Sequence, residues 1–152
     1  MNINITNFSP VWEPRHFRPR LADMLRPLMQ TLKHIVVNIS IDHDDNDPLF
    51  GITSSLEDMR SKNIIESITI GVLVKKDADC HQRDYWGRFD EELTTPGWFS
   101  LKRVSLAIKI IIFRGSDDNL EVALRKLPET QCRRLSTSNS ISFDFEVTPV
   151  LI

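Results

Sequence analysis

Four segments of this chain alternate between apolar and polar residues with a period of two, and they recur at nearly constant spacing. The apolar positions of the first are Ile35, Val37, Ile39 and Ile41. Those of the other three are Ile68, Ile70, Val72 and Val74, then Val104, Leu106, Ile108 and Ile110, and finally Ile141, Phe143, Phe145 and Val147. Period-two alternation rich in β-branched residues predicts β-strands with one apolar and one wetter face.

Helices are predicted between these strands. Asp47-Pro48 supplies an N-cap and a first-turn proline for the first helix. Helical spacing of apolar residues predicts two more, over residues 85–93 and 117–127. A further helix over residues 20–32, bent at Pro27, precedes the first strand. The predicted order is therefore a helix followed by β-α-β-α-β-α-β.

The strands and helices form an internal repeat. The strand starts lie 33, 36 and 37 residues apart, at Ile35, Ile68, Val104 and Ile141. Leu32-Lys33-His34-Ile35 also resembles Leu101-Lys102-Arg103-Val104. A near-constant period indicates stacked structural units. Strand–helix–strand order predicts parallel strands joined by right-handed crossovers.

The faces that the helices cover decide between two architectures. In a doubly wound sheet both faces are covered, so the strands read as continuous apolar runs. Three of the four segments alternate clearly, which leaves one face for water. Residues 104–113 are the exception, because Ile111 and Phe113 are apolar on the second face. We therefore predict an α/β fold that is a parallel one-sided β/α repeat, with four strands and helices on one face. A doubly wound sheet is the alternative.

The chain is expected to form one domain. We predict an extended basic, Pro-rich arm over residues 1–20, a β/α repeat domain over residues 21–147 and a tail over residues 148–152. The prolines and arginines of residues 10–20 are typical of an extended segment. A length of 152 residues with 41% hydrophobic and 26% charged residues is enough for one buried core.

Composition also excludes several classes of function. A dedicated nucleic-acid surface needs a strong basic excess, whereas the formal net charge is −2. The most apolar segment, residues 104–113, is too short to span a membrane and contains Lys109. The isolated Cys80 and Cys132, together with an N-terminus that has no secretory pattern, predict reduced thiols and an intracellular location, cytoplasmic or nuclear.

Five segments carry a resemblance to a known family. Residues 32–39, 64–70, 86–93, 99–104 and 124–128 resemble parts of the leucine-rich-repeat-like C-terminal region of F-box and related proteins of mushroom-forming (basidiomycete) fungi. The resemblance covers about residues 20–147 and implies an irregular leucine-rich-repeat-like solenoid whose surface recognises another protein. The chain shows no F-box-like segment and no strict Leu-x-x-Leu-x-Leu-x-x-Asn signature. A substrate-recognition region related to F-box proteins, but lacking the F-box, is therefore expected.

Residues 42–47 form the richest polar cluster. Asp42, Asp44 and Asn46 are spaced like the ligands at positions 1, 3 and 5 of a calcium-binding loop. The glycine at the next position and the glutamate at position 12 that such a loop requires are absent. His43 with its acidic neighbours could bind a divalent metal where a parallel strand ends. A solvated turn that caps the next helix through Asp47 is the simpler interpretation. We expect no metal here.

Cys80-His81 is the second candidate for chemistry. Zinc sites need paired ligands, and only Cys132 is available as a second cysteine. No phosphate loop or hydrolase motif is present, so we expect no cofactor and no catalytic residue. The alternative function is a small doubly wound α/β enzyme or ligand-binding domain. Its site would lie at the strand C-terminal ends and use Asp42, His43, Asp44 and Cys80.

The wetter strand face is the predicted binding surface for a protein partner. If the four strand starts are in register, one row across the sheet is Asn38, Gly71, Ala107 and Asp144. A second row is Ser40, Leu73, Lys109 and Glu146. Solenoids bind partners on such faces. The alternative is that Lys109 and Glu146 simply neutralise each other as a cross-strand pair. The candidate partner-binding residues of this non-enzymatic domain are Asn38, Ser40, Thr69, Lys109, Asp144 and Glu146.

Overall fold

The structure is a computed structural model that describes residues 2–8, 21–41, 49–75, 84–113 and 119–152. It contains the strands β1 Asn2–Phe8, β2 His34–Ile41, β3 Ser67–Lys75, β4 Arg103–Ile112 and β5 Ser142–Leu151. Its helices are α1 Leu21–Leu25, α2 Phe50–Met59, α3 Tyr85–Thr94, α4 Asn119–Arg125 and α5 Arg133–Thr137, with the short 3₁₀ helix η1 Arg26–Leu28 after α1.

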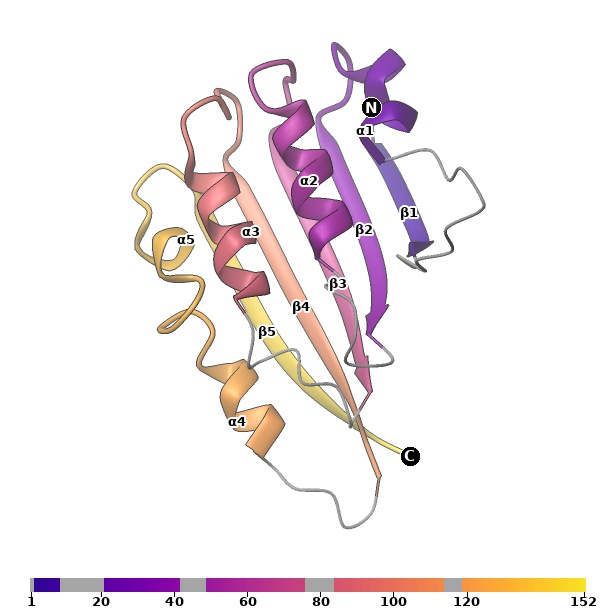
Figure 1. The fold of residues 1–152 in the computed structure, drawn as a ribbon, viewed down its shortest axis with the longest axis vertical. Helices are drawn as coiled ribbons and strands as arrows, with labels where there is room; N and C mark the ends of the chain where they lie inside the picture. The colour runs from indigo at the N-terminus through magenta and orange to yellow at the C-terminus, as the bar shows by residue number, and fades with distance from the viewer. Residues whose placement is uncertain (1, 9–20, 42–48, 76–83, 114–118) are drawn as a thin grey trace.

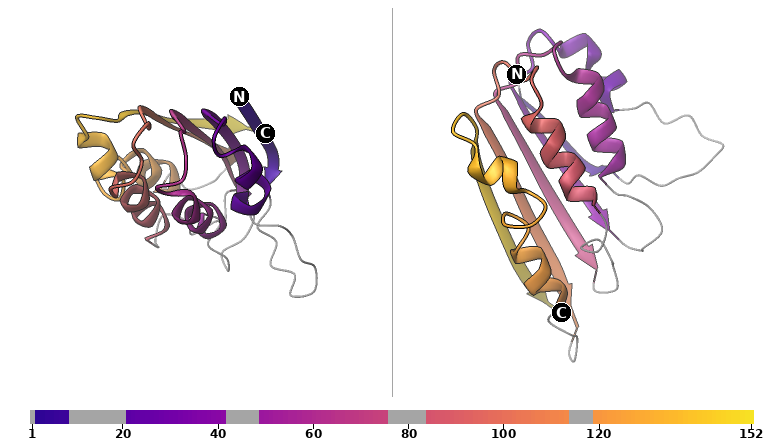
Figure 2. Two further views of the ribbon diagram at one scale, coloured as in Figure 1. Left: turned by 90° about the horizontal axis from the view of Figure 1, so that it is seen from above. Right: turned by 60° about the vertical axis from the view of Figure 1, so that its left-hand side comes forward.

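The five strands form one parallel sheet in which spatial order follows chain order, β1-β2-β3-β4-β5. The described helices lie on one face of this sheet (Figures 1 and 2). They form a single layer in which α1 contacts α2, α2 contacts α3, and α3 contacts α5. A doubly wound sheet reverses its strand order and is covered on both faces. The predicted parallel α/β fold is therefore confirmed, and the described part of the chain is not doubly wound.

The predicted number of strands is wrong, because residues 2–8 form a fifth strand. Ile3 of β1 pairs with Ile35 of β2, and its side chain packs on the edge of the core. Ile3 and Ile5 do alternate with asparagines, but the pattern is short and the register shifts between Ile5 and Phe8. The N-terminal arm predicted for residues 1–20 is therefore a strand over 2–8, while residues 9–20 lie outside the described part.

The C-terminal boundary also differs from the prediction. Residues 148–152 were expected to form a tail, but β5 continues to Leu151. The physical reason is that β4 remains extended to Ile112, which pairs with Leu151 and accepts a hydrogen bond from the Ile152 amide at 3.2 Å. The preceding helix α5 was not predicted either, since five residues are too few to show a helical period.

Most of the predicted helices are present. The segment over 85–93 is α3, and the segment over 117–127 contains α4. Pro27 lies at the start of η1, so the N-terminal helix changes there from α to 3₁₀ geometry. The Asp47-Pro48 start expected for the first crossover helix lies outside the described residues, and α2 begins at Phe50.

The hydrophobic core lies between the sheet and the helical layer. Ile35, Ile68 and Val104 form an in-register row in which each side chain is at most 1% exposed. Trp86 and Phe89 of α3 are equally buried from the other side. Full burial of a large apolar side chain contributes about 1.5–3 kcal/mol, so this shared layer is what holds successive units together.

A buried carboxylate joins α3 to α5. Asp90 is 3% exposed, and its two oxygens accept the backbone N–H groups of Arg134 and Leu135 at 3.1 and 2.8 Å. These amides belong to the first turn of α5, where no residue of the helix itself can accept their hydrogens. Asp90 therefore acts as a helix cap supplied from a neighbouring helix.

Candidate binding surface

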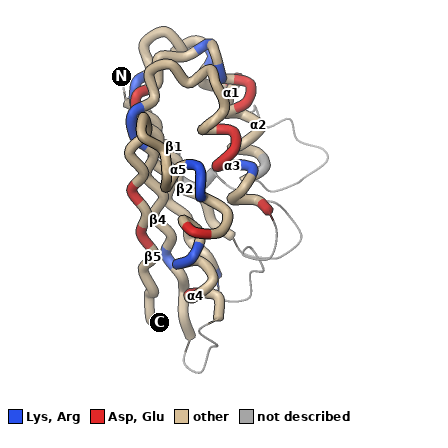
Figure 3. The backbone as a smooth tube through the Cα atoms, turned by 90° about the vertical axis from the view of Figure 1, so that its left-hand side faces the viewer, with Lys and Arg blue, Asp and Glu red and all other residues tan. Residues whose placement is uncertain are grey.

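The sheet has an open face, which we define as the face opposite the described helices. Side chains alternate across every strand, so in β2 the residues Ile35, Val37, Ile39 and Ile41 point to the helices and are at most 3% exposed. The residues between them are partly exposed on the other face. β3 and β4 repeat the pattern. Figure 3 shows the strands along one side of the molecule and the helices along the other.

The register of β2, β3 and β4 is the predicted one. Ile35 pairs with Ile68, and Ile68 pairs with Val104. Asn38, Gly71 and Ala107 consequently form one open-face row, and Ser40, Leu73 and Lys109 form the next. A Cβ atom added to Gly71 would meet the Asn38 side-chain oxygen. The Asn38 amide thus lies over Gly71, in the space that a larger residue would occupy.

The predicted register of β5 is wrong by two residues. Val104 pairs with Phe143 rather than Ile141, so Ala107 lies opposite Glu146 and Lys109 lies opposite Thr148. The cause is the turn after α5, where the Ser138 hydroxyl accepts the Ile141 amide at 3.1 Å. The ladder begins one residue later, with the Ser142 amide bonded to the Lys102 carbonyl at 2.8 Å. A shift of two keeps each side chain on its predicted face.

Asp144 and Glu146 therefore have other partners than those predicted. Arg103 forms an ion pair with Asp144, at 3.3 Å between Nε and Oδ2. Glu146 Oε1 accepts a hydrogen bond from the Thr148 hydroxyl at 3.0 Å. The row predicted to hold Lys109 and Glu146 does not exist, so the two are not directly opposed.

The open face thus brings together all six predicted residues, spread over four strands. Asn38 and Ser40 come from β2, Thr69 from β3, Lys109 from β4, and Asp144 and Glu146 from β5. Asp144 shares its row with Thr69 rather than with Asn38. Neutral hydrogen-bonding groups consequently lie towards β2, and ionised groups lie towards β4 and β5.

Four polar residues of the same face were not predicted. His34, Ser67, Arg103 and Ser105 occupy its N-terminal half. His34 Nδ1 and the Ser67 hydroxyl are hydrogen-bonded at 2.7 Å. The Ser105 hydroxyl donates to Asp144 Oδ2 at 3.4 Å. The period-two alternation that placed the other residues on the open face extends to these four positions. It could therefore have identified them as well.

The internal repeat explains a chain of charges at the N-terminal ends of the strands. Lys33 and Lys102 occupy equivalent positions in the two similar segments, and each pairs with Glu66, at 3.1 and 3.7 Å. Glu66 precedes β3 as the lysines precede β2 and β4. The hydrogen bond from Lys33, and then the positive charge of Lys102, lower the pKa of Glu66. Three successive units are thus joined by alternating charge.

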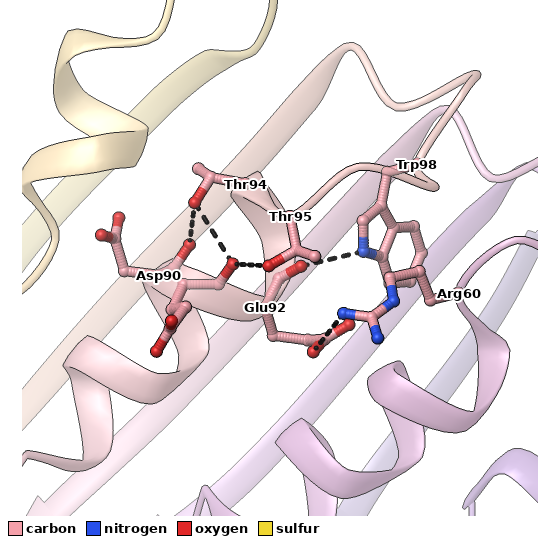
Figure 4. A network of polar contacts seen from close by, with 7 residues as sticks. Arg60, Asp90, Glu92, Thr94, Thr95 and Trp98 are labelled. Carbon is pink, nitrogen blue, oxygen red and sulfur yellow. Dashed lines mark hydrogen bonds and ion pairs between the residues drawn. The ribbon is translucent and has the colours of Figure 1, made fainter.

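The helical side carries a separate polar network, drawn in Figure 4. Arg60, which follows α2, forms an ion pair with Glu92 of α3 at 3.2 Å. The Trp98 indole N–H donates to the Glu92 backbone carbonyl at 3.1 Å. Burial raises the pKa of Glu92, and the charge of Arg60 opposes that rise. These contacts fix the end of α3 against α2 and the following turn.

The described residues contain no group of three or more His, Cys, Asp or Glu side chains arranged to hold a metal ion. The alternative site residues Asp42, His43, Asp44 and Cys80 lie outside the described part of the chain. Cys132 is a free, fully buried thiol, and burial followed by the charge of Asp90 raises its pKa to about 12. A thiol with that pKa is almost entirely protonated at neutral pH and is a poor nucleophile.

Comparison with protein-family models, with curated proteins and with solved structures gives no match for this chain. Among the described residues, no helix is both long and apolar enough to cross a membrane.

Proposed function

We propose that this chain is a non-enzymatic domain that binds a protein partner through the open face of its sheet. The observation that carries the proposal is the uncovered polar face itself. In the described part of the chain the helices occupy the other face, so the strands present alternate side chains directly to solvent. A parallel sheet is ordinarily covered on both faces, and an uncovered sheet face is the kind of surface that β/α solenoids use for recognition.

The proposal includes an irregular leucine-rich-repeat-like solenoid, related to the substrate-recognition regions of fungal F-box proteins. Two observations support it. Strand order follows chain order throughout the sheet, as stacking of successive β/α units requires. The similar segments before β2 and β4 also have the same structural roles, because Leu32 and Leu101 are buried while the lysine after each pairs with Glu66.

The chemistry of the open face defines the kind of partner. Asn38, Ser40 and Thr69 offer hydrogen bonds, and Lys109 and Glu146 offer opposite charges. A partner with a polar surface and charges of both signs would complement this arrangement, and a uniformly charged polymer would not. An intracellular location belongs to the same proposal, and the free thiol of Cys132 is consistent with it.

Charge reversal on the open face tests the proposal. The doubly substituted variant Lys109→Glu, Asp144→Lys should lose capture of the partner from an extract of the source organism. Its thermal midpoint should change little, because Lys109 is exposed and the Arg103–Asp144 pair is more than half exposed. Lys126→Glu, in the turn after α4, is a charge-reversal control at an exposed site away from the sheet and should capture normally. Equal capture by both variants would remove the open face as the binding surface.

A further inference from the structure

The outer edge of β5 is the longest edge of the described sheet. β5 is a ten-residue strand whose neighbour in that sheet is β4. The amide of Ser142 donates to the Lys102 carbonyl just before β4 at 2.8 Å, and the amide of Ile152, the residue after β5, donates to the Ile112 carbonyl at the end of β4 at 3.2 Å. Because peptide groups point to alternate sides along a strand, the even-numbered residues of β5 bond to β4. The odd-numbered residues direct their N–H and C=O groups away from the sheet.

Pro149 belongs to this outward set. Its missing N–H therefore costs the β4–β5 ladder nothing, which is why proline is tolerated in this strand. It also removes an outward donor, so that a further strand would find donors at the partly exposed Phe143 and Phe145, a buried residue at Val147, and no donor at 149. The edge that can accept a strand is thus limited to about residues 143–146.

The side chains along this edge differ on the two faces of the sheet. On the helical face, Phe143 and Phe145 are partly buried, and their ring centroids lie 6.0 Å apart. On the open face, Asp144 and Glu146 are both exposed. An added strand would place alternate side chains next to each pair. The complementary sequence is therefore apolar at every second position and basic at the positions between.

A second copy of β5 does not meet this requirement. Antiparallel pairing of two β5 strands about residues 143–146 would bring Asp144 and Glu146 of one copy next to those of the other. Like charges on neighbouring strands are destabilising, and of these carboxylates Asp144 has an ion-pair partner in Arg103. The charge of the edge therefore favours a basic partner over self-association.

We infer that the outer edge of β5 binds an extended segment of a partner protein as a sixth strand, with Lys or Arg beside Asp144 and Glu146 and apolar side chains beside Phe143 and Phe145. Main-chain hydrogen bonds supply affinity in this mode, and the alternating side chains supply specificity. The inference goes beyond the proposed use of the open face, because it concerns peptide groups that the face itself does not present.

The test uses a capped peptide in which lysine alternates with valine, and a control peptide in which glutamate replaces lysine. Amide hydrogen exchange of the whole protein is measured with each. Without peptide, the even-numbered amides of β5 should be protected and those of Phe143 and Phe145 should exchange quickly. The lysine peptide should slow exchange at these two amides. The glutamate peptide should bind roughly threefold to tenfold more weakly, as the loss of two exposed ion pairs predicts.

Pro149→Val adds an outward donor and should tighten binding of a peptide that reaches position 149, by about threefold. Ser142→Val introduces the same side chain where the amide bonds to the residue before β4, and should leave affinity unchanged. A Lys109→Glu variant separates this inference from the proposed function, because that side chain lies on β4 and its substitution leaves the outward peptide groups of β5 unchanged. It should still bind the peptide even if it fails to capture the partner.

Two results would overturn the inference. One is that the lysine peptide adds no protection at the amides of Phe143 and Phe145, whether or not it binds elsewhere. The other is protection of these amides in the free protein together with the mass of a dimer, which would assign the edge to a second copy of the chain.

Discussion

The capping role of Asp90 gives the most sharply defined prediction. Asp90→Ala removes the acceptor for two backbone N–H groups at the start of α5. Leu135 is 1% exposed, so water does not replace the lost partner of its amide. Arg134 is exposed, so its amide can turn to water. A buried unsatisfied donor costs about 1–3 kcal/mol, and the second bond contributes about 0.5–1.5 kcal/mol.

The removal of a buried charge partly offsets this loss, since burial raises the pKa of Asp90 despite the two backbone hydrogen bonds. We expect a net destabilisation of about 2–3 kcal/mol. For a chain of this size that corresponds to a fall in thermal midpoint of roughly 5–10 °C. Asp90→Asn keeps one acceptor oxygen and should be less destabilising than Asp90→Ala.

Urea unfolding followed by circular dichroism measures this effect, with Glu91→Ala as the exposed neighbouring control on α3. Amide exchange at Leu135 should accelerate in Asp90→Ala more than exchange at core amides of β3. An Asp90→Ala variant within about 0.5 kcal/mol of the parent protein, the spread usual for surface substitutions, would refute the capping argument.

Three further predictions concern single residues. Gly97 has a φ of +126°, and an added Cβ would lie 2.6 Å from Arg60 Cγ and 2.7 Å from Ser61 Oγ. Gly97→Ala should therefore lower the free energy of unfolding by about 1–3 kcal/mol. An unchanged urea midpoint would contradict this prediction. Cys132 should react with a thiol reagent at pH 8 only after the protein unfolds, since burial raises its pKa to about 12. Mass spectrometry measures the modification at this position, and rapid modification in the native protein would contradict the prediction. The lowered pKa of Glu66 stabilises the fold above its usual value of 4.5, and this contribution disappears as pH falls through the lowered value. The stability difference between the parent protein and Glu66→Gln should therefore vanish in acid and shrink in high salt, and a difference independent of pH would count against the ion pairs.

The central three strands were predictable because burial and alternation coincide in them. Ile35, Ile68 and Val104 mark equivalent positions in units of similar length, so their register followed from the strand starts. Rows through Asn38 and Ser40 could then be placed correctly across β3 and β4. When helices cover only one face of a sheet, apolar and polar residues alternate strictly along its strands, and this alternation is easy to recognise in the sequence.

The outer strands were less predictable for local reasons. β5 begins after a turn held by the Ser138 hydroxyl, and side-chain bonding of this kind shows no hydrophobic period. In β1 only two isoleucines, Ile3 and Ile5, alternate with polar residues, and the register with β2 shifts after Ile5. Asp90 was missed as well, because a cap supplied by another helix is a contact between residues 44 and 45 positions apart.

Partner binding by the open face is tested most directly by photo-crosslinking. A photoreactive amino acid is placed at Lys109 on the open face, or at Lys126 in the turn after α4; both positions are exposed. We predict that the first protein crosslinks to a partner in an extract of the source organism and that the second does not. Crosslinking from position 126 alone, or equally from both positions, would contradict the account.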